Sequence, residues 1–428
     1  MPSLVTLLLQ ITVIIISARV VGILFRKLRQ PQVMGEMVAG ILLGPSLLGW
    51  VAPGVSAALF PTSSLGYLNA LSQVGLVIFM FLVGLGLNLH ELKKQGHAAV
   101  LTSHVSITAP FVLGGLLALY FYPRLSDDSV TFTGFALFLG AAMSITAFPV
   151  LARILTERNM LQSKLGTVAV ACAAVDDVTG WCVLAYIVLV VRAQQGKTPL
   201  WLILTGAVSF GLIMVLGVRR VLRRFEDAFR KRGELSENLV ALILLLALAS
   251  ALFTEWLGIH PLFGAFLFGA IMPKRPQFAQ YLLDRFESLT VILLLPIFFA
   301  FTGLRTSLRL VRGAEMWFYC AIIILVAIAG KLGGSMIAAR VTGMRWREAA
   351  GLGVLLNTRG LMELVILNIG LDIKVISPAL FSMMVLMALL TTFMTAPLLE
   401  WIYPARLILP ESPAVVPRRI TKPVSIAG

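Results

Sequence analysis

Two adjacent carboxylates, Asp176 and Asp177, stand in the middle of an otherwise apolar segment, residues 166–191. A charged side chain at the centre of a bilayer costs between about 2.5 and well over 10 kcal/mol, so acids occur in spans chiefly where they line a water-filled cavity, pair with a cation or bind one. About ten apolar or small residues on each side give a span of about 20 residues, which disfavours the alternative of a solvated interhelical loop. Because Na⁺, K⁺ and H⁺ prefer oxygen ligands, and one carboxylate holds a proton or a metal ion but poorly both, the pair predicts a cation site.

Helix breakers and polar side chains interrupt two other apolar segments near the centre of the membrane. The first interruption contains Ser144, Thr146 and Pro149, and the second contains Asn357 and Arg359. Unwound helices at this depth occur where backbone carbonyls and half-helix ends serve ions, and a matching pair in the two halves of a chain is typical of inverted-repeat transporters. An ordinary kink explains Pro149 equally well on its own, but two interrupted spans together favour a transport site.

Three further charges lie within apolar segments. Lys331 does not fit a phosphate-binding loop, because the glycine and hydroxyl positions of that motif do not match. A lysine that snorkels to the membrane surface is the alternative, but its position deep in a span favours neutralisation of an acid, with Asp176 as the best candidate. Arg359 and Glu363 are four residues apart, so they can pair on one helix face if the helix resumes there. We expect these two charges to support the interrupted helix.

The composition excludes an ordinary soluble protein. Of the 428 residues, 59% are hydrophobic and 13% are charged, where soluble domains have about 25% charged residues. The first apolar segment lacks a basic start and is followed at once by Arg26, Lys27 and Arg29, which indicates a retained helix rather than a cleaved signal peptide. The cysteines all fall in apolar segments without metal-ligand spacing, so we interpret them as packing residues: Cys172, Cys182 and Cys320.

Apolar runs and the turn residues between them predict an all-α polytopic membrane protein with about thirteen spans. The predicted spans are 4–24, 33–50, 65–87, 98–122, 132–155, 165–191, 200–222, 238–257, 261–272, 289–304, 316–339, 349–370 and 378–402. Spans four to six and eleven to thirteen are expected to form two three-helix inverted repeats that interlock around the acid pair. The whole membrane domain is expected to cover residues 1–403, with its core helices at about 98–191 and 316–402 and the remaining helices as a scaffold.

The basic residues fix an expected orientation. The net charge is +15, and most of the 35 lysines and arginines fall in the loops on one side of the predicted spans. Basic loops face the cytoplasm, so the N-terminus is expected outside and the C-terminus inside. The same distribution, without interleaved aromatic residues, argues against nucleic acid as a partner. Residues 404–428 are expected to form a short cytoplasmic tail.

Two more segments carry structural expectations. The mixed-charge stretch 219–237 is expected to be an amphipathic connector that lies at the cytoplasmic lipid surface. Gly40 and Gly44 form a Gly-x-x-x-Gly pattern, which predicts close packing of their helix against another.

Four motifs together resemble the monovalent cation:proton antiporter superfamily. They are the segment 35–46 (GEMVAGILLGPS), the segment 144–155 (SITAFPVLARIL), the segment 174–181 (AVDDVTGW) and the segment 357–370 (NTRGLMELVILNIG). The most similar branch contains the plant and fungal K⁺(Na⁺)/H⁺ exchangers and the Kef-like, glutathione-gated potassium efflux systems. The resemblance covers nearly all of residues 1–400.

This resemblance implies a homodimer in which a core domain moves past a dimerisation domain while Na⁺ or K⁺ exchanges for H⁺. It also implies site roles: Asp177 binds cation or proton, Asp176 faces Lys331, and Ser144 and Thr146 lie with the interrupted spans around the site. Asn357, Arg359 and Glu363 are expected to support it. In double-acid sodium/proton antiporters the acid of span twelve directly follows the Arg-Gly pair, whereas Glu363 sits four residues after Arg359, so its role is not transferred. The large cytoplasmic C-terminal domain of many branch members has no counterpart among the 428 residues.

The expected function is therefore a secondary antiporter that works by alternating access, with no cofactor beyond the transported ions and no enzymatic activity. The alternatives are a cation channel and a proton-coupled potassium efflux system without its regulatory domain. A channel needs a selectivity filter of carbonyls or rings of acids, and the sequence offers one acid pair. The expected location is a bacterial inner membrane, and the sequence does not decide between Na⁺ and K⁺ because selectivity depends on ligand geometry.

Overall fold

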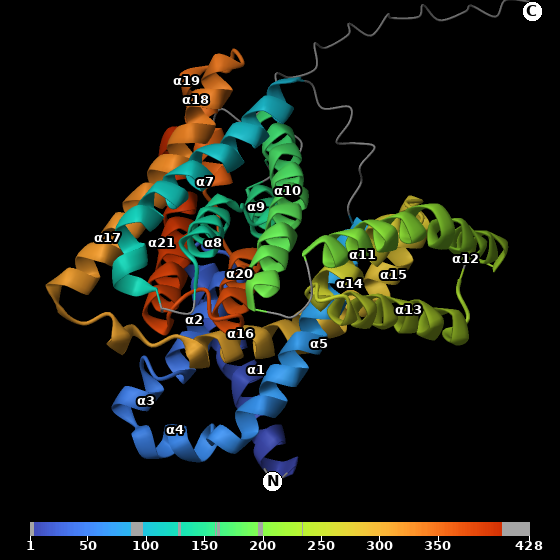
Figure 1. Ribbon diagram of the computed structural model, residues 1–428, viewed down its shortest axis with the longest axis horizontal. Helices are drawn as coiled ribbons and strands as arrows, with labels where there is room; N and C mark the ends of the chain where they lie inside the picture. Colours follow the sequence, from blue (N-terminus) through green and yellow to red (C-terminus); the bar gives the residue numbers. More distant parts are fainter. Residues whose placement is uncertain are drawn as a thin grey trace, which may run out of the picture.

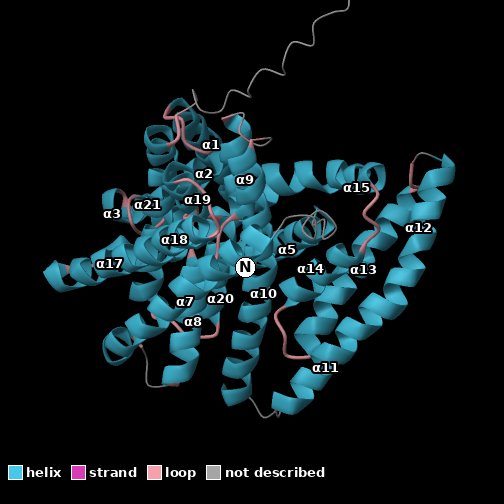
Figure 2. Ribbon diagram, turned by 90° about the horizontal axis from the view of Figure 1, so that it is seen from above, coloured by secondary structure: helices cyan, strands magenta, loops and turns pink. Residues whose placement is uncertain are grey.

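A computed structural model describes residues 4–86, 97–126, 130–158, 160, 163–195, 200–232 and 234–404. These residues fold into helices, with no strand in the described ranges (Figure 2). The predicted tail, 404–428, lies outside them except for its first residue.

The chain order begins with the helices α1 (Leu4–Lys27), α2 (Gln32–Leu43), α3 (Leu48–Val51), α4 (Pro53–Leu59), α5 (Thr62–Gly86), α7 (His97–Leu125), α8 (Phe132–Ser144), α9 (Phe148–Glu157), α10 (Lys164–Gln195), α11 (Leu200–Leu212), η1 (Ile213–Val218) and α12 (Arg219–Arg232). It continues with α13 (Glu237–Trp256), α14 (Pro261–Ile271), α15 (Pro276–Leu289), η2 (Thr290–Leu294), α16 (Leu295–Arg305), η3 (Leu308–Leu310), α17 (Gly313–Ile328), η4 (Ala329–Gly333), α18 (Gly334–Val341), α19 (Trp346–Leu356), α20 (Leu361–Asp372) and α21 (Pro378–Ile402).

Eleven helical segments in the described part are long and apolar enough to cross a membrane, and a twelfth is formed by the bent pair α19 and α20. The remaining apolar helix, α14, has 11 residues and corresponds to the short ninth span expected from the sequence. Figure 1 shows α7 to α10 gathered with α17 to α21 on one side, while α11 to α15 lie together on the other. The first group contains the segments that the sequence assigned to the core, and the second contains only part of the expected scaffold, which also includes α1 to α5 and α16.

Glycines allow α2 and α16 to touch backbone to backbone. A Cβ atom added at Gly40 would lie 2.2 Å from the Phe299 carbonyl oxygen, and one at Gly44 would lie 2.3 Å from the Gly303 carbonyl oxygen. A Cβ at Gly303 would lie 2.0 Å from the Gly40 carbonyl carbon. The close packing predicted from the Gly-x-x-x-Gly pattern is therefore confirmed, with α16 as the partner helix.

The stretch 219–232 differs from the connector expected at the lipid surface. It forms α12, which continues directly from α11 through the π-helical segment η1. Its aromatic face is covered by α15: the Phe229 ring lies 5.6 Å from that of Phe278 and 5.3 Å from that of Tyr281, and Glu226 pairs with Arg275. The apolar face that was expected to meet lipid is thus satisfied by another helix, which sequence periodicity alone does not reveal.

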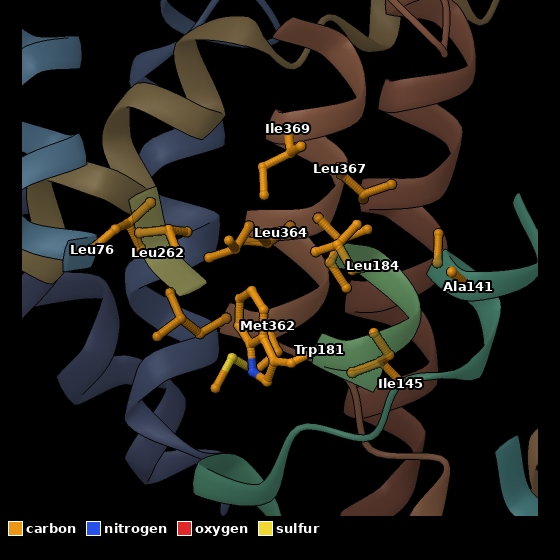
Figure 3. Close-up of a cluster of buried hydrophobic side chains, with 14 of the residues drawn as sticks. Leu76, Ala141, Ile145, Trp181, Leu184, Leu262, Met362, Leu364, Leu367 and Ile369 are labelled. Carbon is orange, nitrogen blue, oxygen red and sulfur yellow. The ribbon is translucent and has the colours of Figure 1, made fainter. Parts of the chain in front are cut away.

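Apolar side chains of α10 and α20 share one buried cluster with side chains of α14. In the view of Figure 3, Leu364 of α20 lies between Leu262 of α14 and Leu184 of α10, and Ile369 lies further along α20. These residues belong to one large buried cluster. The Trp181 ring also lies 5.5 Å from Phe263 and 6.3 Å from Phe266 of α14, centroid to centroid.

The glycine contact between α2 and α16 gives a test of the fold. We expect Gly303→Ala to destabilise the protein by at least about 2 kcal/mol, because the new methyl group would overlap backbone that has no room to move. Gly66→Ala is the control, since nothing lies within 4 Å of an added Cβ on that residue of α5. Thermal unfolding in detergent should separate the two variants, and equal unfolding midpoints would contradict this packing.

Candidate functional site

The two interrupted helices cross and hydrogen bond through their breaks. The first break separates α8 from α9, and the second separates α19 from α20 with a bend of 44°. The Ala147 backbone N–H donates to the Thr358 carbonyl oxygen at 3.0 Å, and the Thr146 hydroxyl oxygen lies 3.0 Å from the Leu356 carbonyl oxygen. Each break therefore satisfies backbone groups that the other exposes, which is required where no water is available.

Arg359 closes the carboxyl end of the half-helix α8. Its guanidinium donates to the carbonyl oxygens of Ala142 at 2.9 Å and Met143 at 2.6 Å, and it contacts Glu363 at 3.3 Å. The local pairing of Arg359 with Glu363 is as the sequence predicted. A helix C-terminus carries unsatisfied carbonyls and partial negative charge, so a buried guanidinium stabilises it.

Asp176 receives hydrogen bonds from two helical segments, α7 and η4, and from the first break. Lys331 donates to its Oδ2 atom at 2.8 Å, and Thr146 donates to the same atom at 2.7 Å. The Ser106 hydroxyl donates to Oδ2 at 2.8 Å, and the Ser103 hydroxyl donates to Oδ1 at 2.7 Å. Because Asp176 and Lys331 are both fully buried, these donors hold the carboxyl group of Asp176 in one place. The predicted contact between Asp176 and Lys331 is confirmed.

Ser103 and Ser106 of α7 were not predicted as site residues. They are three residues apart and so share one helix face, and this spacing of hydroxyls in an apolar segment was the available signal. The sequence does not show that this face of α7 points toward α10.

Asp177 is built differently from its neighbour. Its side chain is 5% exposed, it accepts a hydrogen bond from the Phe148 backbone N–H at the start of α9, and its Oδ1 atom has no hydrogen-bond partner among the described residues. The positive end of α9 thus faces Asp177, while one carboxylate oxygen is left for another ligand. A buried carboxylate oxygen without a donor is a place for a proton or a cation.

The other predicted site residues take supporting positions. The Ser144 hydroxyl donates to the Gly140 carbonyl oxygen at 2.6 Å, so it turns back along α8 rather than toward the acids, and its backbone carbonyl accepts from Lys331 at 2.5 Å. Asn357 and Glu363 are buried and each keeps one side-chain oxygen without a partner in the described part of the chain. No cluster of three or more His, Cys, Asp or Glu residues that could hold a metal ion occurs there, and none of the three cysteines forms a disulfide.

Two interrupted, crossing helices with charged groups at their ends define a class of membrane transporter whose ions bind at the point of crossing. The comparisons agree with that class. The family profile described as "Sodium/hydrogen exchanger, transmembrane" matches residues 15–401, and the chain belongs to that family.

Curated relatives extend this result. The Na⁺/H⁺ antiporter NhaS4 of Synechocystis is 44% identical over 406 residues, which are 94% of this chain and 98% of that protein. Cation/H⁺ antiporter 20 of Arabidopsis thaliana is 40% identical and K⁺/H⁺ antiporter 1 of Saccharomyces cerevisiae is 34% identical. The chain spans about half the length of these two, with 49% and 46% covered.

Among solved structures, the sodium proton antiporter MjNhaP1 from Methanocaldococcus jannaschii at pH 8 matches with a TM-score of 0.68. The match covers 95% of this chain and 99% of that protein at 15% identity, which shows a shared fold.

The position of Arg359 gives a test of the site's construction. We expect Arg359→Ala to destabilise the protein by about 3–5 kcal/mol, because it leaves Glu363 and two carbonyls buried without their donor. Arg309→Ala is the matched control, since Arg309 is exposed. Thermal unfolding of the purified variants measures the difference, and an unchanged midpoint for Arg359→Ala would contradict the capping role.

Proposed function

We propose that this chain is a secondary antiporter that exchanges a monovalent cation, Na⁺ or K⁺, for H⁺, and that Asp177 is the group shared by cation and proton. The observation that carries the proposal is the difference between the two acids. Asp176 is occupied by four donors, while Asp177 keeps a buried oxygen without one. The names of the relatives, which include Na⁺/H⁺ and K⁺/H⁺ antiporters, support the same exchange.

The exchange follows from competition for one carboxylate. With Asp177 ionised, a cation binds its free oxygen, and the carbonyl and amide oxygens of the two breaks, such as that of Asn357, offer further ligands of the kind that hard cations prefer. With Asp177 protonated, the cation loses its counter-charge and leaves. Asp176 and Lys331 stay paired beside it and keep the local charge compensated.

Alternating access requires the site to face each side of the membrane in turn. The hydrogen bonds given above for Asp176 all come from the group α7 to α10 and α17 to α21, which includes η4. Apolar side chains of α10 and α20 share a buried cluster with side chains of α14 in the other group (Figure 3). We assign the first group as the moving core and the second as the scaffold through which two copies associate as a homodimer in the membrane. The excess of basic residues in the loops on one side supports a C-terminus in the cytoplasm.

Loss of the shared carboxylate gives the first test of this function. We expect Asp177→Asn to fold and to lose exchange by at least about a hundredfold, because an amide neither titrates nor carries charge. The measurement is cation-dependent proton movement in proteoliposomes that contain a pH-sensitive dye. Asp284→Asn on α15 is the control, because Asp284 is exposed and accepts a hydrogen bond from the neighbouring Gln280 side chain. Coupled exchange above about a fifth of the wild-type rate would remove Asp177 from this role, and conductive rather than saturable flux would indicate a channel.

Competition between proton and cation gives the second test. Because protonation of Asp177 excludes the cation, the half-saturating cation concentration should rise as the pH falls and approach tenfold per pH unit once Asp177 is mostly protonated. The measurement is the initial exchange rate against cation concentration at several values across about pH 6–9, where a buried carboxylate can titrate. A half-saturation that stays constant over this range would mean that the two ions use separate sites.

A further inference from the structure

A proline in the interior of α7 leaves a backbone carbonyl beside the acid pair without its helical N–H donor. Pro110 lies inside this helix and has no N–H, so the carbonyl of Ser106, four residues earlier, loses the donor that a regular helix would supply. In a dry site such a carbonyl needs another partner.

Lys331 supplies that partner. Its ammonium donates to the Ser106 carbonyl oxygen at 2.9 Å and lies 3.2 Å from the Ser106 hydroxyl, which in turn donates to Asp176 at 2.8 Å. The remaining acceptors of the ammonium are Asp176 itself and the Ser144 carbonyl oxygen at the end of α8. Both carbonyls that hold Lys331 therefore belong to interrupted helical hydrogen bonding, one at a proline and one at a break.

Close packing of η4 against α7 at Gly330 places Lys331 near the Ser106 carbonyl. A Cβ atom added at Gly330 would lie 2.8 Å from the Pro110 Cα atom and 3.0 Å from its Cβ atom, so η4 and α7 touch directly at the proline. The Pro110 atoms in this contact are its Cα and Cβ atoms. An alanine at position 110 has both atoms, so it would preserve the contact.

A second carbonyl that a proline leaves without a helical donor also accepts a hydrogen bond from a side chain in the described part of the chain. Pro397 lies inside α21, and the carbonyl that it leaves without a helical donor belongs to Phe393. The buried Gln30 side chain donates to that carbonyl at 3.1 Å. In both helices, a proline is matched by a side-chain donor from a distant segment.

We propose that Pro110 is a positioning residue of the exchange site: by withholding a backbone N–H from the Ser106 carbonyl, it reserves that carbonyl for Lys331 and so fixes the ammonium against Asp176. This inference rests on the proposed function for its effect on transport, but its structural part stands on the contacts of Lys331 alone. Pro110, which interrupts the hydrogen bonding of its helix, therefore has a role in transport.

The experiment is Pro110→Ala, because a purely structural role and a positioning role predict opposite results. Alanine restores the helical N–H and favours a regular helix, so the thermal midpoint should stay the same or rise. The restored N–H competes with Lys331 for the Ser106 carbonyl, and the maximal exchange rate in proteoliposomes should fall at least about fivefold, the modest loss expected for a displaced rather than deleted group. The matched control is Pro123→Ala in the same helix, where the carbonyl concerned belongs to the exposed residue Leu119. That variant should exchange like the wild type.

A second measurement tests the contact without transport. In a Lys331→Met background the Ser106 carbonyl has lost its side-chain donor, so Pro110→Ala should raise the thermal midpoint by at least about 2 °C more than it does in the wild type. Pro123→Ala should shift the midpoint equally in both backgrounds. Equal shifts for Pro110→Ala would overturn the inference.

The transport outcomes are equally decisive. A Pro110→Ala protein that exchanges within fivefold of the wild type, or that unfolds, would overturn the positioning role, the latter by making Pro110 a folding residue. If Pro123→Ala also lost exchange, the positioning role would be overturned, because the loss would then come from a change in the shape of α7. If the wild type itself shows no cation-dependent proton movement, the proposed function fails. The comparison of thermal midpoints for Pro110→Ala in the wild-type and Lys331→Met backgrounds still tests the inference in that case.

Discussion

The structure depends on the burial of the ion pair between Asp176 and Lys331. Moving either charge out of water carries a penalty of several kcal/mol, which is offset only when the partners are close and their remaining hydrogen-bonding capacity is filled. Here every oxygen of Asp176 and every N–H of Lys331 has a partner, drawn from α7, α10, η4 and the break after α8. Four segments distant in sequence are therefore obliged to meet at one point, and the arrangement of the surrounding helices follows from that requirement.

The helix breaks are the source of the groups that meet this requirement. An intact span offers the membrane interior only side chains, because its backbone groups bond to one another. The break between α8 and α9 releases carbonyls that take Arg359 and Lys331, and it presents the amide end of α9 to Asp177. One interruption thus provides a cation-stabilising end and an anion-stabilising end a few residues apart, which is how a site for two opposite charges is assembled without water.

Much of this site could be predicted from the sequence, because charged residues within apolar segments are rare and informative. The two acids, Lys331 and the two breaks stand out for this reason, and the structure brings them together. Ser103 and Ser106 were missed because serine is compatible with any helix face, and only the rotation of α7 decides what it touches. Ser144 was expected among the residues around the site, but a serine hydroxyl in a helix can donate to the carbonyl four residues earlier, and the Ser144 hydroxyl does so. The contact between α12 and α15 was likewise beyond prediction, since an amphipathic helix looks the same whether lipid or protein covers its apolar face.

The apolar surface between α20 and α14 has a consequence for the energetics of motion. In water, separating Trp181, Met362 and Leu262 would expose hydrocarbon and incur the full hydrophobic penalty, but lipid tails are as apolar as these side chains. Sliding one helix group past the other therefore exchanges one hydrocarbon neighbour for another, and the change in solvation free energy along the path is small. The hydrocarbon interior of the membrane thus keeps the solvation cost low for the sliding motion proposed for the core.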